Sequence, residues 1–598
     1  MPLGDHPVTP RRAPGGPRGD DGPAAALLLR VLGTLLREDV AGLRSRSVPH
    51  HAPDGRWLRL AGRGDAETLL LPVREDGFQA EWTARLPLLR RETSGTDLTS
   101  CDDVLAALAA HADPADRPGF AAFARECRHA LDAARLHDAT DAATSAALGD
   151  RYGTDPAGWT GPAASLAFDT LAARTDHPVY PASRGRAGLG EADLRAYAPE
   201  FHPSFRLRLL ALPAGAVTST GRAPAGAPPV APSAAGLPER LDAGHVLLPV
   251  HPLTADGPLA DALRARGLHD RAVPAPRDRG PLVVPTLSMR TVALAADPRV
   301  HIKLPLATAT LGLLNRRTVR PGTLRDGAAG QRLLEAVVAR EPRFRETVLL
   351  ADETVHAHAG HELLAAMTRT LPAAAAGATV VPLAALLAPA PGGGTVLDRL
   401  ARRHSGGDPL ALLDALLTLL FDWQTTLFGY GIALESHQQN VSLVLDPAAA
   451  HPVRLLLKDN DGPRVNTVRL RARLGPGAPG PAFDDPRVLC TDDGPVADLF
   501  TTVTVHLCAG AFAFGLAAGD RARLGELLRL VRDRLRQAVA RLGPADGGDV
   551  LRTRVLEAPR LPVKAMVTAG TLLTKARSGA SDINKHYTTG PNYLPREA

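Results

Sequence analysis

The spacing of apolar residues changes twice along the chain, and these changes limit the folds that it can adopt. From about residue 23 to 150, apolar residues recur at the spacing of an amphipathic helix, as in AAALLLRVLGTLLRE. From about residue 161, short aliphatic runs such as HVLLPVHPL and RVHIKLPLAT lie between proline and glycine, which is typical of strands. Long helical patterns return after residue 395. These patterns, in a chain of 598 residues, predict an α+β protein of several domains.

The boundaries between these sequence patterns divide the chain into four segments. We expect a disordered leader over 1–22, a helical domain over 23–160, a β-rich domain over 161–394 and a largely helical domain over 395–598. Within these segments, the alternating residues 57–71 indicate one hairpin, residues 442–459 indicate a second, and 496–543 and 551–577 are expected to be helical. Two tracts rich in proline, glycine and alanine, 212–238 and 371–394, are interpreted as a surface loop and a separator between domains.

Composition excludes several classes of protein. The net charge is only +6 and no run of five basic residues occurs, so nucleic acid is not predicted as a partner. The four cysteines form no CxxC pair, which argues against a zinc ribbon or a disulfide framework and fits a reducing cytoplasm. The uncharged stretches 371–393 and 499–519 are interrupted by proline, or by threonine, histidine and glycine. We therefore predict a soluble cytoplasmic protein without a membrane span, and a buried core helix at 499–519.

The first dense polar patch is DHPVYPASRGRAGLG, residues 176–190. Its HP and YP steps favour an extended chain, because a residue that precedes proline avoids the helical region. Arg184 and Arg186 then enter a turn that contains glycine, which suits the presentation of guanidinium groups to an anion. The alternative is a solvated basic loop.

The second patch carries Ser288 and Arg290 in PTLSMRTVAL, Lys303 in HIKLPL and Arg317 in NRRTVR. Since residues i and i+2 of a strand share a face, Ser288 and Arg290 are predicted to point the same way. Lys303 is one of only five lysines among 69 basic residues, and it lies in an apolar strand. This favours a phosphate-binding ammonium over a lysine that merely extends its stem to reach solvent.

The third patch is GIALESHQQNVSLVLD, residues 431–446, followed by LLLKDNDGPR, residues 455–464. Six consecutive polar residues, 435–440, lie between a helix and an apolar strand, where polar groups need partners or a function. Asp459 closes the next strand, 19 residues after Asn440. A loop asparagine and a strand-end aspartate resemble the Mg²⁺ ligands of kinase-like folds. His437 has no second histidine at zinc-ligand spacing, and a purely structural role for it stays open.

The order of these motifs carries a family resemblance. HPxxPxxRxRxG, PTxSxRT, HIKLPL, GIALExHQQN and LLLKDxDGPR together resemble the NRPS-independent siderophore synthetases, the aerobactin synthetase (IucA/IucC) family. The closing LPVKAM…PNYL resembles that family's C-terminal segment, which is often described as ferric-reductase-like. The resemblance covers roughly residues 160–598 and implies a cupped-hand fold. In that fold, 23–160 is the thumb, 161–394 the β-rich fingers and 395–598 the palm, with ATP between fingers and palm.

The resemblance also implies a reaction: ATP-dependent condensation of a carboxylic acid with an amine or hydroxyl, through an acyl-adenylate, with release of AMP and pyrophosphate. The residues that it assigns to ATP are His177, Arg184, Ser288, Arg290, Lys303, Arg317, Gln439 and Asn440. Those that it assigns to Mg²⁺ are Glu435, Asn440 and Asp459, and those that it assigns to the acid substrate are His437 and Lys564. Catalysis is expected to depend on His437, Arg290 and Lys303.

Several positions depart from the family pattern. Tyr180 stands where a second histidine is usual, Arg184 replaces a lysine, Leu313 a threonine and Lys458 an arginine, and Gly570 lies near an expected arginine. The identities of the acid and the nucleophile therefore stay open. Two other functions remain as alternatives: a small-molecule kinase that uses the same Mg–ATP cleft, and a non-catalytic siderophore- or iron-handling protein. A homodimer is possible.

Overall fold

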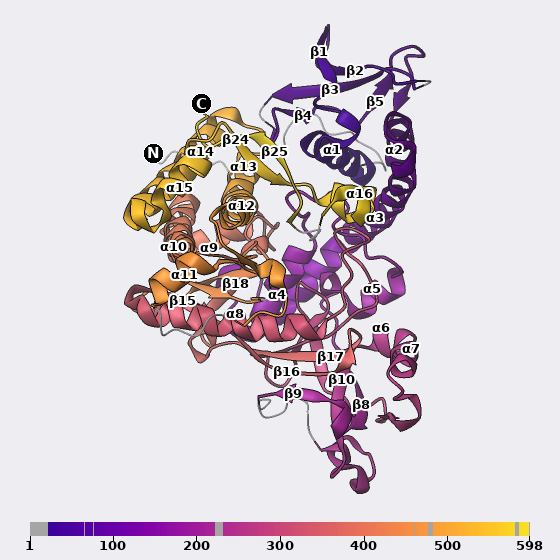
Figure 1. Ribbon diagram of the computed structural model, residues 1–598, viewed down its shortest axis with the longest axis vertical. Coiled ribbons are helices and arrows are strands. Elements are labelled where there is room, and N and C mark those ends of the chain that lie inside the picture. The colour runs from indigo at the N-terminus through magenta and orange to yellow at the C-terminus, as the bar shows by residue number, and fades with distance from the viewer. Residues whose placement is uncertain are drawn as a thin grey trace, which may run out of the picture.

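The computed structural model describes residues 22–596 except 65, 76, 222–230, 461, 476–481 and 581–584. The expected leader, up to residue 21, and much of the 212–238 tract lie outside the described residues. Helices alternate with several mostly antiparallel sheets, which confirms the predicted α+β class. In Figure 1, the indigo N-terminal part lies beside the gold and yellow C-terminal part at one end of the molecule. The magenta strands β8 and β10 lie at the other end.

The N-terminal segment is not purely helical, which corrects the expectation for 23–160. Helix α1 (Gly22–Arg37) buries the apolar stripe that the sequence showed and packs against a six-stranded sheet. The predicted hairpin is present, with Trp57 opposite Pro72, but three further strands are only two or three residues long and carry no periodic signal. The strands are β1 (Ser47–Ala52), β2 (Gly55–Leu60), β3 (Leu69–Glu75), β4 (Trp82–Ala84), β5 (Leu89–Arg91) and β6 (Asp97–Leu98). Helices α2 (Cys101–His111) and α3 (Arg117–Tyr152) follow.

The middle of the chain forms a seven-stranded sheet that positions Lys303. Its strands, in spatial order, are β7 (Phe205–Arg206), β12 (Leu282–Pro285), β13 (Thr291–Leu294), β14 (Val300–Lys303), β17 (Leu364–Thr370), β16 (Asp352–His361) and β9 (Thr218–Thr220). Strand β14 is central, and Lys303 pairs with Thr291 on one side and Met367 on the other. A smaller sheet consists of β10 (His245–Val250), β8 (Arg208–Pro213) and β11 (Val273–Pro274).

The alanine-rich tract 371–394, interpreted from composition as a separator between domains, is itself part of a sheet and of the buried core. It contains β18 (Thr379–Pro382), which joins β15 (Val348–Leu350), β20 (Val441–Leu445) and β21 (Val453–Leu457) in a four-stranded sheet. Ala385, Leu386 and Ala388 are fully buried. Small side chains let this segment pack closely into the core, so its low complexity reflects tight packing. The hairpin predicted over 442–459 is confirmed as β20 and β21.

The C-terminal third builds its core around α10 (Pro409–Gly429), whose first turn is capped by the Asp408 side chain. Two segments, Pro409–Gly429 and Gly494–Ala517, are long and apolar enough to span a membrane by length and composition. Most of each apolar window is buried inside the protein, 61% and 83% respectively, as in core helices. Within the expected helical stretch 551–577, residues 560–564 instead form strand β24, which places Lys564 at a strand end.

The remaining helices and strands complete the fold. The helices are α4 (Gly161–Ala173), α5 (Glu191–Tyr197), α6 (Pro252–Ala255), α7 (Pro258–Ala265), α8 (Pro321–Arg340), α9 (Val396–His404), α11 (Thr467–Leu474), α12 (Gly494–Leu499), α13 (Ala511–Ala517), α14 (Arg521–Leu542), α15 (Asp549–Leu551) and α16 (Lys575–Ser578). The strands are β19 (Ile432–Ala433), β22 (Arg464–Asn466), β23 (Leu489–Cys490), β24 (Arg560–Lys564) and β25 (Tyr587–Pro591).

Candidate active site

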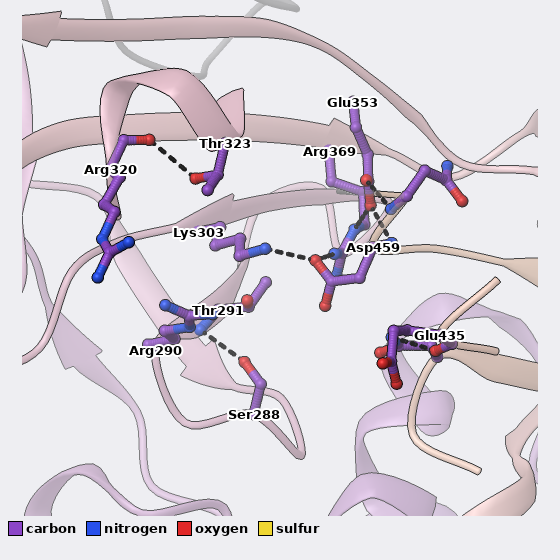
Figure 2. Close-up of polar contacts among 12 residues, drawn as sticks. Ser288, Arg290, Thr291, Lys303, Arg320, Thr323, Glu353, Arg369, Glu435 and Asp459 are labelled. Atoms are coloured by element: carbon purple, nitrogen blue, oxygen red, sulfur yellow. Dashed lines mark hydrogen bonds and ion pairs between the residues drawn. The ribbon is translucent and has the colours of Figure 1, made fainter. Parts of the chain in front are cut away.

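Asp459 follows the end of β21 and receives two cations from the seven-stranded sheet. Lys303 Nζ lies 2.6 Å and Arg369 Nη2 2.8 Å from the same oxygen, Oδ1 (Figure 2). Burial alone would raise the pKa of Asp459, but Lys303 and Arg369 together hold it well below its usual range. The carboxylate is therefore ionised. Lys303 and the polar 435–440 turn, which belong to different elements of the fold, come together at Asp459.

Glu353, on β16, holds this arrangement from behind. It is 3% exposed, and its Oε1 accepts hydrogen bonds from Arg369 Nε at 2.6 Å and from the Asp459 backbone N–H at 2.8 Å. Its Oε2 accepts a longer one, 3.3 Å, from the Asn460 N–H. The backbone of Asp459 has φ of +61°, in the left-handed region that non-glycine residues seldom adopt. Glu353 therefore holds in place both the Arg369 guanidinium beside Asp459 and the left-handed backbone of Asp459 itself.

Sequence analysis did not select Glu353 or Arg369. A usable signal existed for Arg369, because it is the one charge in the apolar run LLAAMTRTL. No comparable signal marked Glu353, whose neighbours Asp352 and Thr354 are ordinary strand-edge residues. The pairing of these two residues across β16 and β17 is visible only in the fold.

Ser288 and Arg290 lie in a tight turn between β12 and β13, not on one face of a strand as predicted. Met289 between them has φ of +62°, and the Ser288 hydroxyl accepts a hydrogen bond from the Thr291 N–H at 3.1 Å, which closes the turn (Figure 2). The guanidinium of Arg290 donates to the Thr318 carbonyl at 2.8 Å. The strand rule failed here because PTLSMRTVAL folds as strand, turn and strand within ten residues.

Arg317 is a further buried cation near this turn. Its Nε donates to Thr310 Oγ1 at 2.5 Å. Burial, and after it the nearby charge of Arg290, lowers the pKa of Arg317 to about 9. Arg290, Lys303 and Arg317 therefore concentrate positive charge beside Asp459, an arrangement that favours a multiply charged anion.

The polar 435–440 turn meets the C-terminal strand through one ion pair. Lys564 Nζ lies 3.1 and 2.9 Å from the two oxygens of Glu435, and both side chains are largely buried. Burial alone would raise the pKa of Glu435, but Lys564, Lys585 and His437 lower it. The Asn440 amide donates to the Glu435 backbone carbonyl at 2.9 Å, which ties the turn to itself. Gln439 lies in the same turn.

Two histidines predicted for the site are electrostatically coupled to it and uncharged at neutral pH. Burial lowers the pKa of His437 to about 4, with opposing influences from Glu435 and Lys564. Burial, and after it the influence of His437, lowers the pKa of His177 to about 3. His177 Nδ1 accepts the backbone N–H groups of Val179 and Tyr180 at 3.2 and 3.0 Å. The ring of His177 therefore shapes the 176–181 loop.

Arg184 is committed to partners within its own region. It donates to Asp176 at 2.8 Å and lies 3.3 Å from His137 Nδ1. Arg186 donates to the buried Glu200 at 2.5 Å. The basic loop is thus ion-paired rather than solvated, and Arg184 reaches an anion only by exchanging Asp176 for it. The departure Tyr180 also has a partner, since its hydroxyl donates to Glu126 at 2.6 Å.

Lys458 and Asp169 influence each other electrostatically, a link that sequence analysis did not make. Burial raises the pKa of Asp169, and the nearby Lys458 opposes that rise. Asp169 Oδ1 is buried without a hydrogen-bond partner in the described part of the chain. Lys458, which the sequence showed only as a departure from the family pattern, therefore interacts electrostatically with a carboxylate of α4.

The comparisons with known proteins agree with the motifs. Residues 165–388 match the model of the IucA / IucC family, and residues 411–578 match that of the ferric iron reductase FhuF-like transporters. A rhizobactin siderophore biosynthesis protein, RhbC, of Rhizobium meliloti is 27% identical over 65% of this chain and 68% of its own length. An uncharacterized protein, y4xN, of Sinorhizobium fredii is 27% identical over about half of each chain.

Solved structures show the same fold. The petrobactin biosynthesis protein AsbB of Bacillus anthracis superposes with a TM-score of 0.71 at 17% identity, over 95% of both chains. ATP-bound aerobactin synthetase IucA of Klebsiella pneumoniae superposes with a TM-score of 0.67 at 18% identity, over 95% of this chain and 99% of its own. The cupped-hand fold is therefore confirmed, and residues 165–388 match the model of the family that the motifs resemble, IucA / IucC.

Proposed function

We propose that this chain is a cytoplasmic, ATP-dependent siderophore synthetase that joins a carboxylic acid to an amine or hydroxyl. The observation that carries this proposal is the cation cluster around Asp459: Arg290, Lys303 and Arg317, in one charged site with the 435–440 turn and Lys564. Buried cations beside a polar turn suit a triphosphate on one side and a carboxylate on the other. The similarity to siderophore biosynthesis proteins supports the same reading.

The proposed reaction has two steps. An oxygen of the acid's carboxylate attacks the α-phosphorus of ATP, the bond to the β-phosphate breaks, and pyrophosphate leaves. The amine or hydroxyl then attacks the acyl carbon, the acyl–phosphate bond breaks, AMP leaves and the nucleophile loses its proton. No covalent intermediate on the enzyme is required, so the residues act by binding, orientation and charge.

We assign the triphosphate to Arg290, Lys303 and Arg317, with Ser288, His177 and Arg184 around them. Lys303 already holds an oxygen anion at 2.6 Å, so a phosphate oxygen would exchange for, or share, the position of Asp459 Oδ1. Lys564 would orient the acid by exchanging Glu435 for a substrate carboxylate. His437, neutral and electrostatically coupled to Glu435 and Lys564, would accept a hydrogen bond or a proton from the nucleophile.

Mg²⁺ fits part of the oxygen set predicted for it. Asp459 Oδ2 has no hydrogen bond to any described residue, whereas both oxygens of Glu435 hold Lys564. Within the described residues, no group of three histidine, cysteine or acidic side chains converges as a metal cage. Mg²⁺ commonly binds through one or two carboxylates with substrate phosphates and water. We therefore propose Asp459 as its main protein ligand, with Asn440 and Glu435 secondary; Mg²⁺ would neutralise phosphate charge.

A pyrophosphate-release assay tests this function. The purified chain is incubated with ATP, Mg²⁺, polyamines and a panel of acids: citrate, a citrate monoamide, α-ketoglutarate and a succinyl-hydroxamate. Equal amounts of AMP, pyrophosphate and condensed product support the proposal. ADP and a phosphorylated acid would identify a kinase instead.

The match of residues 411–578 to a ferric-reductase-like family keeps an iron-handling function as the second candidate. Binding of a ferric siderophore, without nucleotide turnover on any acid, would favour it. The expected homodimer stays a prediction that light scattering of the purified chain can check.

A further inference from the structure

A cavity of about 290 Å³ lies on the N-terminal side of the 176–181 loop, away from the cation cluster. Helix α1, strand β4 and residues 178–181 contribute to its wall. Part of the wall is basic, with Arg30, Arg37 and Arg74, and part is aromatic, with Phe78 and Trp82. Among the described residues, no carboxylate lines it. Its volume is at the lower end of the range for small-molecule sites.

Arg37 gives this cavity a polar group that is buried and incompletely paired. The residue is 6% exposed, and its Nη2 donates to the Thr34 hydroxyl at 2.9 Å and to the Val179 carbonyl at 2.5 Å. Its Nε–H has no hydrogen-bond partner among the described residues. The adjacent Glu38 does not supply one, because its carboxylate accepts from Val567 and Thr568. Burial lowers the pKa of Arg37 to about 10, so it remains charged at neutral pH.

The other two arginines differ in how free they are. Arg30 forms an ion pair with Asp176 and donates to the His177 and Tyr180 carbonyls. Arg74 is exposed and makes no hydrogen bond or ion pair with the described residues, so the cavity reaches the surface there. The positive charges left for a ligand are therefore those of Arg37 and Arg74.

We propose that this cavity binds a small organic monocarboxylate with an apolar body, its carboxylate on Arg37 and its body against Phe78 and Trp82. A carboxylate would form a charge-assisted bond with the guanidinium of Arg37, whose Nη1 makes no hydrogen bond to the described residues. The aromatic rings would bury the apolar part. This ligand site is separate from the candidate active site, since the 176–181 loop lies between them, and it does not depend on the proposed synthetase function.

Gly33 offers a steric test that removes no charge. It lines the cavity, and a Cβ placed there would contact only the Thr83 hydroxyl, at 3.7 Å. A leucine at position 33 therefore extends into the cavity, and it favours the helix more than glycine does. Gly33→Leu should fold and fill the site, whereas Gly33→Ala should leave most of the space.

The probe is 3-phenylpropionate, titrated into the full chain by isothermal calorimetry at pH 7.5, with 3-phenylpropanol as the uncharged match. We expect the acid to bind with a Kd of about 1 mM or tighter, and the alcohol at least about tenfold more weakly. Gly33→Leu should abolish binding. Arg37→Gln should weaken it by about tenfold or more and Arg74→Ala by about threefold. Arg63→Ala, which removes an exposed arginine outside the cavity, is the control and should change it less than twofold.

Three results would overturn the proposal: no binding at 10 mM probe, equal binding of acid and alcohol, or unchanged binding to Gly33→Leu. Lys564→Ala locates the probe. If that variant loses the acid while Gly33→Leu retains it, the acid occupies the candidate active site and the cavity proposal is wrong. If Arg37→Gln does not fold, the comparison of Gly33→Leu with Gly33→Ala decides.

Discussion

Replacing Glu353 by glutamine tests whether the support behind Asp459 matters. The substitution keeps the size and shape of the side chain but removes its charge. It removes one carboxylate partner of Arg369, which is 2% exposed and also pairs with Asp459. If Oε1 keeps its two hydrogen bonds, the amide nitrogen of the glutamine takes the place of Oε2. That nitrogen can only donate, so the Asn460 N–H loses its acceptor.

The expected cost follows from these contacts. Two hydrogen bonds at Oε1 lose the negative charge of their acceptor, a cost of about 1–1.5 kcal/mol each. A buried N–H at Asn460 left without an acceptor adds about 1–3 kcal/mol. The total, about 3–6 kcal/mol, is close to the cost of breaking a buried ion pair. At about 2–4 °C per kcal/mol for a unit of 150–250 residues, the midpoint of the unit that contains Glu353 should fall by roughly 6–24 °C.

Thermal unfolding followed by circular dichroism measures this shift, and pyrophosphate release measures the function. We expect kcat/KM for ATP to fall together with the midpoint, because Asp459 loses its support. Glu346→Gln is the matched control: Glu346 is 69% exposed and lies 3.7 Å from His451, so its midpoint should stay within about 1 °C. A Glu353→Gln protein that unfolds within 2 °C of the wild type would refute the reasoning.

Four further predictions concern the site and the buried histidines. Lys303→Ala should raise KM for ATP by about 10–100-fold, because one charge-assisted contact is lost, and Lys303→Arg should restore little because a planar fork does not fit the packed central strand. Asp459→Asn should reduce pyrophosphate release to about 1% or less in a folded protein. Lys564→Ala should raise KM for the acid while KM for ATP stays within about twofold. His251 is fully buried, and burial lowers its pKa from 6.5 to about 3, so the stability of the protein should fall as the pH drops from about 6.5 toward 3. In His251→Asn, which can keep the cap to Leu253, the midpoint of thermal unfolding should fall less between pH 7 and pH 5 than in the wild type.

Each of these has a result that contradicts it. A Lys303→Ala enzyme with an unchanged KM for ATP would leave the lysine as part of the sheet alone. Full turnover by Asp459→Asn would remove the Mg²⁺ assignment. A rise in KM for ATP, rather than for the acid, in Lys564→Ala would place that lysine at the nucleotide. An acid-induced loss of stability that is identical in His251→Asn would assign the loss to other buried histidines.

Local patterns predicted a good part of the fold. The runs around residues 245–250, 282–285, 291–294 and 300–303 are strands, and the two predicted hairpins are present. Periodicity failed where elements were short, as in β4 to β6, and composition failed at 371–394, where alanine packs in a core. A two- or three-residue strand has too few side chains to show a period, and the burial of a small side chain depends on what packs against it.

For the candidate site, the sequence by itself determined the residue types: the rare Lys303, the polar 435–440 turn, and the aspartate at the end of an apolar strand. It did not determine their partners. Lys303 and Asp459 are separated by 156 residues, Lys564 and Glu435 by 129, and each pair forms only because sheets and helices bring distant segments together. Only the tertiary structure revealed Glu353 and Arg369 behind Asp459 and the incompletely paired Arg37 in its cavity. Local propensity acts over a few residues, whereas charge pairing and burial depend on distance in space.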